Sequence, residues 1–232
     1  MDIQQKDIIR SYGRRKSKAL SPKRVSALED VLPLYGIKKD SLHNNINPAE
    51  FFSFKPKEIW FEIGFGSGEH LVHQALNNPE IGLIGCEPFI NGVSALCTFI
   101  KDNNIKNIMI WDSDARLLMN ELKPNSLDKL FLLHPDPWPK TRHHKRRFIQ
   151  KETLDVFSSL LKDGAEFRTA TDHRPLAQWM LEKTYFHPNF EWKANCAKDW
   201  LTPPDDWIET KYCNKGKVAG REPLYFNFIN KL

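Results

Sequence analysis

The stretch LHPDPWPKTRHHKRR, residues 133–147, contains one carboxylate, Asp136, with a proline on each side and a cluster of basic side chains behind it. Proline fixes its own φ and biases the preceding residue toward extended conformations, so the backbone around Asp136 is expected to be stiff. A carboxylate held in this way is suited to binding a substrate group in one orientation. We therefore predict that Asp136 belongs to a functional site.

A second group, Glu62-Ile-Gly64-Phe-Gly66-Ser-Gly68, forms a glycine-rich turn preceded by an acid. Glycine permits dihedrals that a Cβ forbids and lets backbone N–H groups approach a ligand. The third glycine is one position too early for the dinucleotide fingerprint G-x-G-x-x-G. Glu62 would repel a pyrophosphate, whereas it suits a ligand with positive charge. The pattern resembles motif I of class I S-adenosylmethionine methyltransferases, whose cofactor carries a sulfonium and an ammonium group.

Two further acids follow the next two predicted strands. Glu87 ends LIGCEP, where a carboxylate can accept hydrogen bonds from both hydroxyls of a ribose. Asp114, in WDSDAR, is placed to receive an adenine amino group, with Asp112 as an alternative in the same stretch. Any one of these acids is equally suited to capping a helix. Three acids after three successive strands, together with the glycine turn, indicate a cofactor site.

Alternating strands and helices must position these residues. The sequence predicts strands over 58–65, 81–88, 107–114, 127–137, 165–172 and 223–230, and helices over 67–78, 90–104, 145–162 and 175–185. Helical crossovers between strands imply a parallel sheet, so we expect a doubly wound, mostly parallel α/β fold. Such sheets bind ligands beyond the carboxyl ends of their strands, which is where the acids lie.

The region before residue 58 has a different character. Residues 1–24 hold eight Lys or Arg and two acids, whereas the chain as a whole has a net charge of +5, so the body is nearly neutral. A basic arm of this kind is typical of nucleic-acid binding, and a solubilising tail is the alternative. A helix is expected over VSALEDVLPLYGI until Pro33 and Gly36 stop it, followed by a linker over 38–57. We therefore divide the chain into residues 1–57, the arm, helix and linker, and residues 58–232, the catalytic domain.

Composition excludes several classes of protein. Cys86, Cys97, Cys196 and Cys213 show no C-x-x-C pairing, so we expect reduced thiols, no zinc site and a cytoplasmic location. No apolar run approaches the ~18 residues that a membrane span requires, and the amino-terminal stretch has no secretion signal.

The element PDPWPK…HHKRRF, with EIGFGSGEHL, CEPFINGV, DARLL, TATDHRPLAQWM and TKYCNKGKVAG, resembles the tRNA (guanine-N7)-methyltransferases over most of the chain. The resemblance implies a seven-stranded, Rossmann-like class I methyltransferase sheet. It also implies methyl transfer from S-adenosylmethionine to N7 of guanosine 46 in the variable loop of tRNA, with S-adenosylhomocysteine as product. The partner is then tRNA, and the protein a monomer or homodimer.

The resemblance also assigns residues. It implies cofactor contacts at Glu62, Glu87, Asp114 and Asp136, beside the turn of Gly64, Gly66 and Gly68, and it makes Asp136 the catalytic residue. It implies guanosine contacts at Lys140, Asp172 and Thr210. The family's carboxyl-terminal motif typically reads T-x-x-E, but here it reads TKYC, so Cys213 stands in the place of the glutamate. Glu209 and Glu222 are the candidates to replace it.

The implied chemistry explains the charges around Asp136. Guanine N7 carries a lone pair and no proton, and the base becomes cationic on methylation, so a fixed carboxylate can orient it and stabilise the charge. We expect Asp172 to accept N–H bonds from the base edge. We expect a phosphate-binding rim, with a solvated helix start as the alternative, at Lys140, Arg142, Lys145, Arg146 and Arg147. His143 and His144 are adjacent and lack a carboxylate set, so we predict no metal.

Three other functions compete with this one. A methyltransferase that acts on ribosomal RNA or on an adenine amino group is the alternative within the same enzyme class. A nicotinamide-dependent oxidoreductase is disfavoured by the glycine spacing and by Glu62. A non-catalytic RNA-binding subunit with a relict cofactor pocket is disfavoured by the four intact acids, although Cys213 leaves it open.

Overall fold

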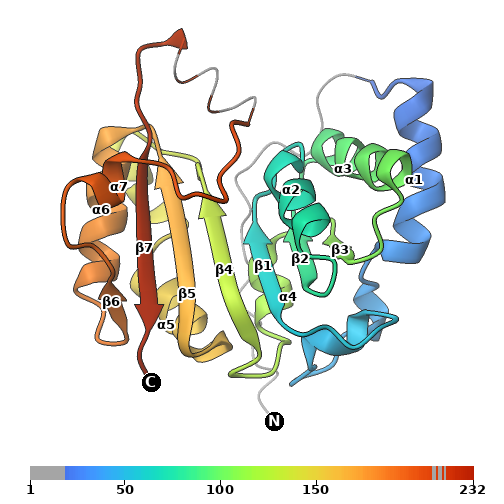
Figure 1. Cartoon of the computed structure of the whole chain (residues 1–232), viewed down its shortest axis with the longest axis horizontal. Coiled ribbons are helices and arrows are strands. Elements are labelled where there is room, and N and C mark those ends of the chain that lie inside the picture. Colours follow the sequence, from blue (N-terminus) through green and yellow to red (C-terminus); the bar gives the residue numbers. More distant parts are fainter. Residues whose placement is uncertain (1–18, 211–212, 214–215, 217) are drawn as a thin grey trace.

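A computed structural model describes residues 19–210, 213, 216 and 218–232 of the chain (Figure 1). Most of the predicted basic arm, residues 1–18, lies outside the described residues. Within the described part, no helix is long and apolar enough to cross a membrane.

The described residues form one seven-stranded sheet. Its strands are β1 (Ile59–Ile63), β2 (Gly82–Cys86), β3 (Ile108–Trp111), β4 (Leu127–Leu133), β5 (Leu161–Thr171), β6 (Phe190–Trp192) and β7 (Leu224–Asn230). The spatial order is β3-β2-β1-β4-β5-β7-β6, in which β7 runs antiparallel to both of its neighbours and the other pairings are parallel (Figure 1). The predicted doubly wound, mostly parallel α/β sheet is therefore confirmed.

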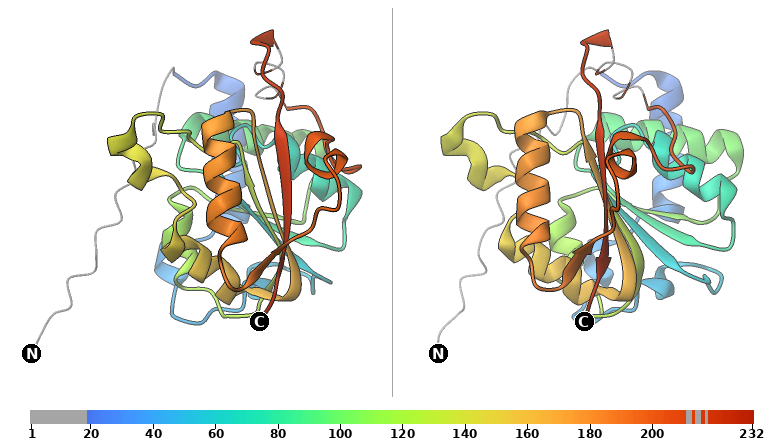
Figure 2. Two further views of the ribbon diagram at one scale, coloured as in Figure 1. Left: turned by 90° about the vertical axis from the view of Figure 1, so that its left-hand side faces the viewer. Right: turned by 60° about the vertical axis from the view of Figure 1, so that its left-hand side comes forward.

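Helices cover both faces of the sheet. They are α1 (Pro22–Tyr35), α2 (Glu69–Asn77), α3 (Ile90–Asn103), α4 (Ala115–Met119), α5 (Lys151–Leu160), α6 (Arg174–Tyr185) and α7 (Lys198–Leu201), with 3₁₀ turns η1 (Lys39–Ser41), η2 (Pro48–Phe51) and η3 (Thr141–Arg146). Apolar side chains of α1, α2 and α3 form one core with the sheet, and those of α4, α5 and α6 form the other (Figures 1 and 2).

Strand β1 shows why the sequence folds in this way. All five of its residues are buried, because neighbouring side chains alternate between the two faces and both faces are covered. Trp60 packs in the core beneath α2 and α3, whereas Phe61 packs in the core on the opposite face. An apolar run that is short and buried on both faces is typical of a central parallel strand.

Two predicted boundaries are wrong. The helix expected over 145–162 begins at Lys151, where Gln150 and Thr153 form a capping box, and it ends at Leu160. Leu161 begins β5 and pairs with Leu127, so the apolar pair 160–161 belongs to two elements. Helix α1 begins at Pro22 rather than Val25 and passes through Pro33, because a proline in the last turn removes only one intrahelical hydrogen bond, but it ends at Tyr35 with Gly36 as its C-cap, as expected. The short elements β6, α4 and α7 were not expected from the sequence.

Candidate functional site

The glycine turn opens onto free space at the carboxyl end of β1. Gly64, Gly66 and Gly68 have φ values of 73°, 57° and 84°, a region that side chains with a Cβ rarely adopt. A Cβ added at Gly64 or Gly66 would meet nothing within 4 Å. One added at Gly92, at the start of α3, would lie 2.2 Å from the Gly66 carbonyl oxygen. Glycine is therefore required at position 92 by close packing, and at 64 and 66 by backbone conformation.

Glu87 is fixed beside this turn by two backbone amides. Gly66 N donates to its Oε2 at 2.9 Å, and Phe89 N donates to its Oε1 at 3.0 Å. Burial raises the pKa of Glu87 and outweighs these hydrogen bonds, and the negative charges of Asp136 and Glu62 raise it further. The structure therefore brings three of the predicted acids into one electrostatic cluster.

Glu62 is almost completely buried, with 3% of its surface exposed. Its Oε2 lies 2.8 Å from Nδ1 of His70, which is 4% exposed and projects from α2. The His70 ring lies edge-on to Phe131 of β4, with 4.8 Å between centroids. One oxygen of Glu62 is therefore oriented by an imidazole that packing holds in place.

Asp114 has partners for both of its oxygens. It caps α4 by accepting a hydrogen bond from Arg116 N at 3.0 Å, and the Arg116 guanidinium forms a two-point ion pair with it at 2.9 and 2.7 Å. Asp112, the alternative, has an exposed side chain. The structure shows that Asp114 caps α4, and its contact with an adenine group stays a prediction.

Asp136 lies exposed in a backbone that is strained on both sides of it. His134 and Trp138 have φ values of 50° and 43°, although neither is glycine. Such conformations cost roughly 1–3 kcal/mol each and cluster at functional sites. His134 N donates to Ala170 O at 2.7 Å, and Arg147 Nε donates to Pro137 O at 3.1 Å. The loop that carries Asp136 is therefore clamped at both ends, as the two prolines suggested.

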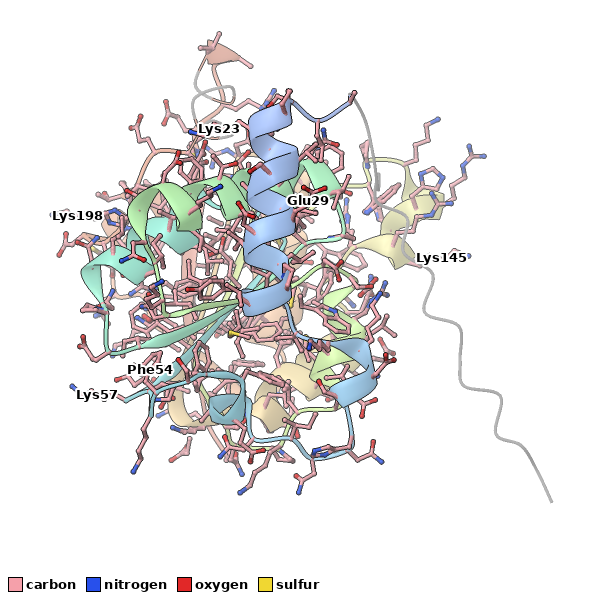
Figure 3. All side chains as sticks on the ribbon, turned by 90° about the vertical axis from the view of Figure 1, so that its right-hand side faces the viewer. Lys23, Glu29, Phe54, Lys57, Lys145 and Lys198 are labelled. Atoms are coloured by element: carbon pink, nitrogen blue, oxygen red, sulfur yellow. The ribbon has the colours of Figure 1, made fainter. Side chains whose placement is uncertain are left out.

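Arg147 does not belong to the predicted phosphate-binding rim. It is 3% exposed, its guanidinium lies over the ring of Trp179 at 5.0 Å, and burial lowers its pKa. Arg142 and Lys145 are exposed on η3, which projects from the body of the protein (Figure 2). In Figure 3 the side chain of Lys145 lies on this projection, away from the sheet. No α-helix begins at residue 145, since α5 starts at Lys151, so no helix dipole acts on these basic side chains.

The predicted guanosine-binding residues come from three segments. Lys140 precedes η3 and has an exposed side chain. Asp172 is buried after β5, and Arg221 Nε donates to its Oδ2 at 2.8 Å. Thr210 lies in the carboxyl-terminal segment, where its Oγ1 donates to the sulfur of Cys213 at 3.3 Å. Asp172 and Thr210 are thus tied to the carboxyl-terminal part of the chain, whereas Lys140 lies directly before η3.

Cys213 connects this segment to the strained loop. It is 3% exposed, and its sulfur lies 3.4 Å from Nε2 of His134. Burial lowers the pKa of His134 to about 4, and the Asp172 carboxylate opposes that shift only in part. Cys213, a small and weakly polar group, therefore faces the loop that carries Asp136.

Sequence reasoning missed four residues that build the site: His70, Gln74, Trp207 and Arg221. His70 and Gln74 are one helical turn apart on α2 and are both buried, although polar residues on such a helix usually face solvent. Their signal is a polar pair on the apolar stripe of Leu71, Val72 and Ala75. Trp207 and Arg221 are linked to the site only by tertiary contacts, for which the sequence gives no local signal.

Comparison with known proteins agrees with this geometry. A family model described as a putative methyltransferase matches residues 56–224. The tRNA (guanine-N(7)-)-methyltransferase of Agrobacterium fabrum is 41% identical over 95% of this chain and 94% of its own. That of Roseobacter denitrificans is 42% identical over 95% of both chains. That of Rhodospirillum rubrum is 42% identical over 94% of this chain and 87% of its own.

The chain belongs to the tRNA (guanine-N7)-methyltransferase family.

Solved structures show the same fold at low sequence identity. The 16S rRNA methyltransferase KamB aligns with a TM-score of 0.56 at 15% identity, over 75% of this chain and 89% of that one. The 16S rRNA (adenine(1408)-N(1))-methyltransferase of Catenulisporales acidiphilia aligns with a TM-score of 0.52 at 14% identity, over 76% and 89%. The seven-stranded sheet of this family member is thus a methyltransferase fold.

Proposed function

We propose that this family member is a tRNA (guanine-N7)-methyltransferase that uses S-adenosylmethionine and methylates guanosine 46 of the variable loop. The observation that carries the proposal is the cluster of Glu62, Glu87 and Asp136 around the open glycine turn. Like charges gathered in this way are costly unless a cation joins them. The sulfonium and ammonium groups of the cofactor supply that positive charge, so the residues present fit it.

The chain's own residues hold this cofactor in defined ways. Glu62 and Glu87 are held by His70 and by backbone amides, and each presents a carboxylate to cationic or hydroxyl groups. Gly64 and Gly66 leave room for a ligand against their backbone. Asp114 is the proposed adenine contact. When bound, S-adenosylmethionine supplies a methyl group on a sulfonium, and S-adenosylhomocysteine is the product.

Asp136 then acts on the guanine. The N7 atom carries a lone pair and no proton, so no base is needed before the transfer. The carboxylate accepts N–H bonds from the base and stabilises the positive charge that the purine acquires. Asp172, held by Arg221, and Thr210, held beside Cys213, are proposed to contact the guanosine from the other side.

Positive charge on η3 suits the RNA backbone. Lys140, Arg142 and Lys145 are exposed, and loss of hydration together with the cations around it lowers the pKa of His143. Concentrated positive charge on a projecting turn favours phosphate contact. We propose that residues 1–57 add further RNA contacts to the catalytic part, residues 58–232, and that the protein acts in the cytoplasm as a monomer or homodimer.

A methyl-transfer assay tests the proposal. The protein is incubated with labelled S-adenosylmethionine and an unmodified tRNA transcript, and the product nucleoside is identified and mapped by mass spectrometry. We expect 7-methylguanosine at one site of the variable loop, and none in a transcript with adenosine at position 46. Binding of both ligands without transfer would instead support the non-catalytic alternative and would direct attention to Cys213.

A further inference from the structure

Strands β4, β5 and β7 present polar side chains on the face that α2 and α3 cover only in part. Lys129, Glu166, Arg168 and Asn227 lie there in register. Residues 202–210, here called the cover segment, cross this face after α7 (Figure 1). The cover segment ends at Thr210, the proposed guanosine contact. Whatever fixes the cover segment therefore also places Thr210.

An ion pair fixes the middle of the cover segment to the sheet. Arg168 Nη1 donates to both carboxylate oxygens of Asp206, at 2.6 and 2.8 Å. Arg168 Nε lies 3.0 Å from Glu166, which Lys129 also contacts at 2.9 Å. Burial alone raises the pKa of Asp206, but the charge of Arg168 outweighs it and the pKa is lowered. The two cations, Lys129 and Arg168, thus balance the two carboxylates, Glu166 and Asp206.

A second connection runs from the cover segment to Glu62. Gln74 Nε2 donates to the backbone oxygen of Asp206 at 3.0 Å and lies 3.3 Å from His70 Nε2. His70 Nδ1 in turn lies 2.8 Å from Glu62 Oε2. One amide group has two hydrogens, and here it meets two acceptors when the His70 proton is on Nδ1. Gln74 is 1% exposed, so water does not compete for these bonds.

Trp207 also connects the cover segment to His70, through ring packing. Its ring centroid lies 5.8 Å from that of His70, 6.2 Å from that of His134 and 4.9 Å from that of Tyr225. Thr210 lies three residues after Trp207 in the sequence. The imidazole that orients Glu62 is therefore also the surface on which the cover segment rests.

We propose that Gln74 and His70 are positioning residues that couple the occupancy of the cofactor pocket to the placement of the cover segment and of Thr210. The coupling rests on the proposed function of the site. A cationic ligand beside Glu62 holds that carboxylate in one orientation, and the carboxylate in turn holds His70 2.8 Å away with Nε2 directed at Gln74. Cofactor binding thereby orders the cover segment, and by reciprocity an ordered cover segment strengthens cofactor binding.

Hydrogen exchange with S-adenosylhomocysteine and without RNA tests this coupling. Calorimetry first establishes that the compound binds the wild-type protein. Exchange at the backbone amides of 205–210 is then measured with and without it. We expect wild-type exchange to slow by about fivefold or more, in the usual range of coupling between sites. In Gln74→Met, which keeps the length of the side chain but cannot donate, we expect less than about twofold slowing at saturating ligand.

The matched control is Asn107→Leu. Asn107 is another buried amide that holds α2, but it donates to the backbone oxygens of Ala75, Asn78 and Ile81 at the far end of the helix. A structural role alone predicts that both variants lower the melting temperature and that neither changes the protection by ligand. If Gln74→Met does not fold, Trp207→Ala removes the packing contact from a half-buried position and should lose the same protection.

The outcomes separate the two proposals. Equal protection in wild type and in Gln74→Met, or none in a wild-type protein that binds the compound, overturns the coupling and leaves the proposed function intact. Failure of the wild-type protein to bind the compound overturns both. If the wild-type protein shows the expected protection by the compound but does not methylate tRNA, only the proposed substrate is overturned. In turnover, Gln74→Met should raise KM for tRNA about tenfold while kcat changes less than about threefold.

Discussion

Two groups of carboxylates on the same side of the sheet differ in how they are balanced. At the glycine turn, Glu62, Glu87 and Asp136 act on one another, and the pKa of Glu87 is raised. Beneath the cover segment, Arg168 and Lys129 neutralise Glu166, and its pKa is lowered although it is largely buried. This is the difference expected between a ligand-binding group and a structural one, because carboxylates held together are relieved by a bound cation or a shared proton.

The largest expected effect comes from the unbalanced group. Asp136→Asn keeps the shape of the side chain but removes its charge, so the cation formed on guanine loses its stabilisation. We expect kcat to fall about 10²- to 10³-fold, with S-adenosylhomocysteine affinity changed less than about tenfold. Single-turnover kinetics and calorimetry measure the two quantities. Asp163→Asn, an exposed acid at the other end of the sheet, serves as control, and a loss confined to cofactor affinity would move Asp136 out of the catalytic role.

Substitution in the balanced group beneath the cover segment should lower the stability of the protein. Arg168→Met leaves Glu166 and Asp206 without their common partner in a partly buried place. We expect the free energy of unfolding to fall by about 2–3 kcal/mol, below the 3–5 kcal/mol of fully buried pairs because Asp206 is partly exposed. Urea denaturation measures it. The triple change Arg168→Met, Glu166→Gln and Asp206→Asn should recover part of the loss, and no recovery would mean that charge balance is not the cause.

The smallest effect is on pH dependence: both groups lose their effect on acidification, but at different pH values, because the pKa of Glu87 is raised and that of Glu166 is lowered. The raised pKa of Glu87 favours the protonated carboxyl, so affinity for cationic S-adenosylmethionine should fall as the pH drops from neutrality through that pKa, which lies above 4.5, by at most about tenfold per unit. S-adenosylhomocysteine, which keeps the ammonium group but lacks the sulfonium charge, should show less dependence, and Glu87→Gln should remove it. For Glu166, whose pKa is lowered, the stabilisation is complete above 4.5 and is lost only below it. Titrations of binding and of stability between pH 4 and pH 8 separate the two.

The sequence revealed the cofactor end of the site better than the substrate end for a physical reason. Glu62 lies at the end of a buried strand, and Gly64 and Glu87 directly follow one, so their position at the carboxyl ends of the strands can be predicted from the alternation of strands and helices. Arg147 could not be placed, because a run of basic residues shows no local sign that one guanidinium turns inward onto Trp179. The ion pair of Asp172 with Arg221 depends on β7 lying beside β5, which is a property of the whole topology.

The bridge between Gly36 and Ile110, in which Ile37 N donates to Ile110 O at 2.8 Å, lies on the outer edge of β3. An uncovered strand edge is a template for pairing with another chain. The segment after α1 therefore shields the sheet from self-association, and the opposite edge is the three-residue β6, which is too short to recruit a partner readily. A fragment that begins at residue 58 would expose the β3 edge and should aggregate, even though it retains the glycine turn and Asp136.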